Sequence, residues 1–90
     1  MTSYLVNHQK AKRVFAKRET ELLHAIKNDY TRAKIVRAAE RVREAKIKVF
    51  KAVFSQHSVL PASAYEPDEK AKRWLSRPVE EIIEEYGTTA

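Results

Sequence analysis

Apolar residues recur with helical spacing over most of this chain. Residues 7–54 contain neither Gly nor Pro and are rich in Ala, Lys, Arg, Glu and Leu, which favour helix. In the first half of this stretch the large apolar residues share one helical face at about 100° per residue. They are Phe15, Leu22, Leu23, Ile26 and Tyr30. The pattern predicts helix from about residue 8 onward.

A second apolar face occupies the later part of the same stretch. Ile35, Val42 and Val49 repeat every seven residues, and a small Ala lies three positions after each of them. Heptad spacing with small residues lets a partner helix approach closely. Drawn on one continuous helix, this face lies about 180° from the first, so a straight helix would need partners on opposite sides.

Two arrangements satisfy this change of phase. A continuous helix over 8–54 would be about 70 Å long and would have to dimerise to bury both faces. A break at Asn28 and Asp29 would instead give an antiparallel hairpin of helices 8–27 and 30–54. Asn28 would then take the left-handed C-terminal position and Asp29 would cap the next helix. The phase favours the hairpin.

The last third of the chain has a different composition. Residues 55–67 contain Pro and several Ser and predict an irregular connection, and residues 67–86 predict an acidic helical region. Because Pro inside a helix costs about 3 kcal/mol, Pro78 is expected to divide this region into two short helices. Trp74 lies beside their shared apolar face and is expected in the core, and Gly87 is expected to end the last helix.

Charge is unevenly distributed along the 90 residues, whose net charge is +6. Residues 1–54 carry 14 basic and 5 acidic side chains, a balance of +9, whereas residues 55–90 carry 4 and 7, a balance of −3. The basic side chains of the second helix lie opposite its apolar face and form what we call the basic row. The basic row consists of Lys34, Arg37, Arg41, Lys48 and Lys51. Lys10, Arg13 and Lys17 likewise face away from the first apolar face.

The basic row has two interpretations. A line of long cations along a helix can follow a nucleic-acid backbone. An ordinary solvated helix face also fits, because Glu40 and Glu44 are spaced to pair with neighbouring arginines and lysines. The sequence contains no aromatic residue within the row to stack on a base, so recognition of single strands is poorly supported.

The acidic C-terminal helix supplies a possible partner for the apolar faces. Glu80 with Glu84, and Glu81 with Glu85, flank an apolar centre, so this helix could dock on the hairpin within one chain or across a dimer. The apolar faces exceed what one small chain can cover, which predicts a homodimer. The residues expected to mediate self-association are Ile35, Val42, Val49, Ile82 and Tyr86.

Signals for catalysis, metals and membranes are missing from the sequence. It has no Cys, and His8, His24 and His57 lack metal-ligand spacing, so we expect no enzyme activity, no metal and no cofactor. No apolar run approaches the roughly 20 residues that span a bilayer. Residues 1–18 share the basic, acid-free composition of organellar transit peptides, but a basic first helix is the simpler interpretation, and we expect a cytoplasmic protein.

These patterns predict one all-α domain over residues 1–90. It consists of a helical hairpin, or one long helix, and a shorter acidic C-terminal helical region, associated as a dimeric bundle. The predicted function is a non-catalytic binding module that self-associates and binds nucleic acid electrostatically. The alternative is a protein–protein adaptor or assembly factor whose basic face meets an acidic protein partner.

Overall fold

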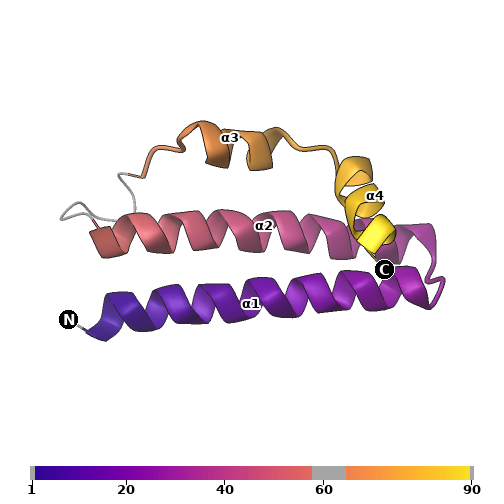
Figure 1. Ribbon diagram of the computed structural model, residues 1–90, viewed down its shortest axis with the longest axis horizontal. Coiled ribbons are helices and arrows are strands. Elements are labelled where there is room, and N and C mark those ends of the chain that lie inside the picture. Colours follow the sequence, from indigo (N-terminus) through magenta and orange to yellow (C-terminus); the bar gives the residue numbers. More distant parts are fainter. Residues whose placement is uncertain (1, 58–64, 90) are drawn as a thin grey trace.

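The computed structural model describes residues 2–57 and 65–89, and the regular elements in this part of the chain are all helices (Figure 1). They are α1 (Thr2–Lys27), α2 (Arg32–His57), α3 (Glu69–Ser76) and α4 (Val79–Thr89). The all-helical fold expected from the sequence is therefore confirmed for the described residues. α1 and α2 run antiparallel along the length of the molecule, α3 lies beside α2, and α4 crosses near the α1–α2 connection (Figure 1).

The chain breaks between α1 and α2, as the phase of the apolar faces predicted, but the left-handed residue is the neighbour of the expected one. Asp29 has φ 52°, and the backbone N–H of Tyr30 donates to the carbonyl of Ala25 at 3.0 Å. With the N–H of Asp29 donating to Ile26 at 3.3 Å, this is a Schellman ending. Asn28 is held in the last helical turn because its N–H and its side-chain amide both donate to the carbonyl of His24.

Asp29 consequently does not cap α2, which begins two residues later than predicted. The carbonyl of Thr31 accepts the first hydrogen bond of α2 from the N–H of Ile35 at 3.0 Å. The other predicted bounds also change, since α1 begins at Thr2 and α2 continues to His57 in the absence of any helix breaker. Residues 58–64 of the predicted irregular connection lie outside the described residues.

The C-terminal region divides at Pro78, as predicted. Asp68 caps α3 by accepting a hydrogen bond from the N–H of Ala71 at 2.9 Å, so α3 starts at Glu69. Arg77 is extended, with ψ 123°, which is the conformation that a following Pro imposes. The expectation that Gly87 ends the last helix was wrong: α4 continues to Thr89, and no glycine has a positive φ.

A small core joins α1, α2 and α4. Leu22, Ala39, Val42 and Ile82 are fully buried and form one cluster. Half-buried residues from all four helices surround it: Phe15, Ile26, Ile35, Ala38, Trp74, Val79, Ile83 and Tyr86. Burial of each large member contributes about 1.5–3 kcal/mol. The two apolar faces of the sequence thus meet each other and α4 within a single chain.

α3 attaches to the hairpin through a group of rings that surrounds one lysine. Trp74 is half-buried and packs edge-on against Phe15, with ring centroids 6.4 Å apart. The ammonium of Lys46 lies 4.9 Å from the centroid of Phe15, 5.3 Å from that of Phe50 and 5.6 Å from that of Trp74. We call these four residues the Lys46 cluster. They tie α3 to both helices of the hairpin through ring packing and cation–π attraction.

Candidate nucleic-acid interface

A continuous shallow groove follows the contact line between α1 and α2. Three adjoining hollows form it, and their lining residues come from these two helices and from Tyr30 in the connection. Neighbouring hollows share residues: Val14, Ala45 and Lys48 join one pair, and Arg37 and Arg41 join the other. No residue of α3 or α4 lines them, so these helices leave this face of the hairpin uncovered.

We call this surface the basic seam because long cations dominate its walls. The basic side chains along it are Lys10, Arg18, Lys34, Arg37, Arg41 and Lys48. Only Glu21 and Glu44 oppose them, so the lining is strongly positive. The floor consists of short apolar residues, which are Ala11, Val14, Ala25, Ala38 and Ala45. The seam can therefore attract an anion along its full length.

Most of these cations are not neutralised by neighbouring carboxylates. Arg18 pairs with Glu21 at 2.8 Å, and Arg37 makes a longer contact of 3.9 Å with Glu40. In the part of the chain that the structure describes, neither Arg41 nor Lys48 forms an ion pair. These two exposed side chains are consequently available to a phosphate.

The cations of the seam affect the pKa of Glu21, which lies among them. The hydrogen bond from Arg18 lowers the pKa of the Glu21 carboxyl, and the charges of Arg18, Lys17 and Arg41 lower it further, against the opposing effect of burial. Arg18 and Lys17 belong to α1 and Arg41 to α2, so charges of both helices act on Glu21.

The structure assembles part of the predicted binding set. Lys34, Arg37, Arg41 and Lys48 line the seam with Lys10 of the other helix. The remaining predicted cations, which are Arg13, Lys17 and Lys51, are exposed but do not line it.

Sequence reasoning missed Arg18 and Val14 as members of the seam. Their spacing of eight and four residues from Lys10 places them on the same face of α1. That signal was visible in the sequence. Its meaning depends on the alignment of α1 against α2, which brings Arg18 beside Arg37 and Arg41 in the central hollow.

The acidic side chains of α4 do not cover the seam. Glu80 pairs with Arg32 at 2.9 Å, and Glu81 pairs with Arg77 at 3.0 Å. Arg77 also bonds Glu85. The α4 carboxylates therefore contact the connection end of α2 and the α3–α4 junction, and the charge of the basic seam is left in place.

Most of the residues expected to mediate self-association pack against the core of their own chain. Val42 and Ile82 are fully buried in the core, and Ile35 and Tyr86 pack against it. The hydroxyl of Tyr86 donates a hydrogen bond to Glu19, and burial, followed by this bond, raises the pKa of Tyr86 well above its usual range. Val49 is half-buried.

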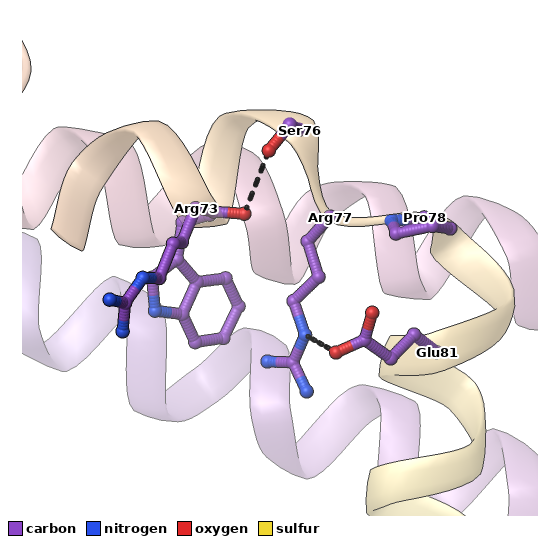
Figure 2. A pocket seen from close by; sticks show the side chains of 6 residues that line it. Arg73, Ser76, Arg77, Pro78 and Glu81 are labelled. Atoms are coloured by element: carbon purple, nitrogen blue, oxygen red, sulfur yellow. Dashed lines mark hydrogen bonds and ion pairs between the residues drawn. The ribbon is translucent and has the colours of Figure 1, made fainter. Parts of the chain in front are cut away.

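A separate hollow at the α3–α4 junction is shaped by contacts that hold the junction together (Figure 2). The guanidinium of Arg77 lies 4.7 Å from the ring centroid of Trp74 and bonds Glu81. The hydroxyl of Ser76 donates to the carbonyls of Lys72 and Arg73 at 2.9 and 3.4 Å. The carbonyl of Arg77 accepts from Arg43 of α2 at 2.8 Å. These polar groups therefore have structural partners.

The described residues include no group of three or more His, Cys, Asp or Glu that could hold a metal ion. His24 is exposed, and its ring lies 3.2 Å from the side-chain amide of Asn28, in the turn that ends α1. None of the described helices is long and apolar enough to cross a membrane.

Comparison with known proteins adds no relative. The chain matches no protein-family model, no curated protein and no solved structure. What can be inferred about function therefore depends on the all-helical fold and on the basic seam.

Proposed function

We propose that this protein is a non-catalytic module that binds nucleic acid through the basic seam. One observation supports this function above all others. Cations from two antiparallel helices converge along a surface that α3 and α4 leave uncovered, and Arg41 and Lys48 on it form no ion pair within the described residues. Phosphates provide a matching line of negative charge.

The expected binding is electrostatic and depends strongly on salt. Each phosphate that a lysine or arginine neutralises releases counterions, which gives a slope of about −0.9 in log affinity against log salt for duplex DNA. If four to six seam cations each meet a phosphate, the slope is about −4 to −5. Fluorescence anisotropy with a labelled 20-base-pair duplex, titrated from about 50 to 200 mM salt, measures it directly.

A charge-matched pair of variants locates the interface. The triple variant Lys34→Gln, Arg41→Gln, Lys48→Gln removes three cations from the seam. Its control replaces three exposed cations of α3, namely Lys70→Gln, Lys72→Gln and Arg73→Gln.

The two variants have the same net charge but different expected binding. The seam variant should lower the magnitude of the salt slope by about 2 to 3, while the control should retain most of the wild-type slope. Equal losses in both variants would show that net charge alone determines binding. If the wild type does not bind at about 50 mM salt, the nucleic-acid function is wrong.

An acidic protein partner is the second candidate, and the docking of α4 favours it. α4 places an apolar centre, with Ile82 fully buried, on the hairpin while Glu80 pairs with Arg32. The basic seam has a similar combination of small apolar floor and cationic walls, to which an acidic-edged helix is complementary. An adaptor would leave nucleic acid unbound and bind an acidic amphipathic peptide, so the same anisotropy assay separates the two functions.

Self-association is a further part of the proposal. Because Val42 and Ile82 are covered within one chain, a homodimer would use apolar side chains that remain exposed. Among the described residues these include Tyr30 and Leu75, which are 42% and 49% exposed. Sedimentation equilibrium on the wild type and on Leu75→Ser tests this expectation. A wild-type protein that sediments as a monomer at all concentrations would contradict it.

A further inference from the structure

We infer that the ligand of the basic seam is a double-stranded nucleic acid that is bound through its backbone without regard to base sequence. This inference rests on the proposed function and narrows it to one class of nucleic acid. It follows from how the aromatic rings are used, from the spacing of the cations and from the short side chains of the seam floor.

Aromatic rings in the described residues are largely engaged by the chain itself. Trp74, the only tryptophan, contacts Phe15 edge-on and has cations of Lys46 and Arg77 near its ring. Phe54 packs against Tyr65 at 5.5 Å between centroids. Proteins that hold single strands rely on stacking each base against an exposed ring, a contribution of about 1–3 kcal/mol per base. Among the described side chains, the basic seam has no such series of rings.

Among the residues whose side chains the structure describes, Tyr30 is the aromatic residue that lines the seam, and it lies at one end of it. The ammonium of Lys34 lies 5.6 Å from its ring centroid, and the His24 ring packs edge-on at 5.6 Å. A single ring at one end can stack on one base at most. For the described side chains, the main source of affinity along the seam is therefore charge.

A surface that binds by charge alone favours the ligand with the higher charge density. Duplex DNA carries one negative charge per about 1.7 Å of its axis, twice the density of one of its strands. The slope per phosphate is also steeper for a duplex, about −0.9 against −0.7 for a single strand. Binding through the basic seam should accordingly be stronger for a duplex than for either strand.

The spacing of the cations also suits a duplex. Lys34, Arg41 and Lys48 recur every seven residues, which is about 10.5 Å along α2, so the three span about 21 Å. That length exceeds the width of the major groove, about 12 Å, and lets the row reach phosphates of both strands. Lys10 and Arg18 form a parallel wall on α1, roughly 8–10 Å away at ordinary helix packing distance.

The main side chains of the seam that can bond a base edge are its arginines and lysines, which bond guanine and, equally, any phosphate. The seam floor of Ala and Val side chains is too short to reach base edges, and the lining includes neither Asn nor Gln, the usual partners of adenine. Arg18 is held by Glu21, at 2.8 Å. Contacts restricted to phosphates fix position and affinity but carry no sequence information.

Separate titrations with five nucleic-acid probes test the inference. At about 50 mM salt the wild-type protein is titrated with two 20-base-pair DNA duplexes of unrelated sequence, one single strand of each, and a duplex RNA. We expect the Kd for the DNA duplexes to be at least tenfold lower than for their strands and to differ less than threefold between sequences. Binding of the duplex RNA within tenfold of DNA also supports backbone recognition.

Different failures have different meanings. Strands that bind as tightly as duplexes, or one sequence that binds tenfold more tightly than the other, would overturn the inference while the proposed function stands. Loss of all binding would overturn the proposed function itself. Tyr30→Ala provides a second check, since it should change duplex affinity less than twofold. A tenfold loss would show that stacking contributes and would refute binding by charge alone.

Discussion

Replacing Lys46 with Met should weaken the attachment of α3 to the hairpin. The lysine ammonium lies within 5.6 Å of three ring centroids, and its side chain is half-buried. A cation–π contact contributes about 0.5–1 kcal/mol when exposed and about 2 kcal/mol when desolvated. One ammonium cannot face three rings optimally, and Met regains some apolar packing. We therefore expect a net loss of about 1–2 kcal/mol in the free energy of unfolding.

Because Trp74 lies in α3, its fluorescence can measure the loss of unfolding free energy at the helix that Lys46 helps to attach. Urea unfolding followed by Trp74 fluorescence reports on α3, and circular dichroism at 222 nm reports on the helices as a whole. For a chain of this size a loss of 1 kcal/mol lowers Tm by about 4–8 °C. The control Lys46→Arg keeps the cation near the rings and should remain within about 0.5 kcal/mol of wild type.

The outcome that would refute this reasoning is a Lys46→Met protein as stable as wild type, or more stable. Such a result would mean that the cost of desolvating the ammonium equals or exceeds its attraction to the rings. A double-mutant cycle with Phe15→Leu provides the quantitative form of the test. A coupling energy near zero would show that the 4.9 Å contact between Lys46 and Phe15 contributes nothing to stability.

Three further changes test the core, the turn and the pH dependence. Ile82→Ala should lower the free energy of unfolding by about 2–5 kcal/mol in urea melts, because a fully buried side chain leaves a cavity; a loss below about 1 kcal/mol would contradict tight docking of α4. Because Asp29 has φ 52°, Asp29→Gly should leave Tm nearly unchanged, whereas the β-branched Asp29→Val should lower it. Equal Tm values for the two variants would contradict the left-handed conformation. Burial, and then the bond to Glu19, raises the pKa of Tyr86 in the folded protein above that of the unfolded chain. The protonated hydroxyl therefore stabilises the fold below about pH 10, and this stabilisation declines as pH rises further. The urea midpoint should fall less between about pH 8 and 11 for Tyr86→Phe than for the wild type. A smaller fall should remain because burial also raises the pKa of Tyr65. Parallel curves for the two proteins would contradict this prediction.

The fold could be predicted where a local rule determines it. The phase shift between the face of Leu22 and that of Val42 indicated the hairpin, and Pro78 indicated the break before α4. Gly87 misled because glycine permits a left-handed ending without requiring one. The turn was misplaced by one residue because Asn28 and Asp29 have similar preferences. Only the hydrogen bonds to His24 show that Asn28 stays helical.

The candidate site was predictable along one helix and not across two. Lys34, Arg41 and Lys48 are related by heptad spacing, which a sequence shows directly. Arg18 joins them through the alignment of α1 with α2, and that alignment depends on how Ile82 and the core pack. The place where the acidic C-terminal helix docks was also beyond local rules, because its carboxylates meet Arg32 and Arg77 instead of the basic row.

The short connection at residues 28–31 has a consequence for the order of folding. Contacts between α1 and α2 next to this connection join residues close in sequence, whereas the bond between Tyr86 and Glu19 joins residues 67 positions apart. Local contacts close small loops, lose less chain entropy and form earlier. The hairpin, and with it the lysines and arginines of the basic seam, should therefore assemble before α4 docks. During folding the amides of α4 would accordingly gain protection from hydrogen exchange last, after the basic seam has formed.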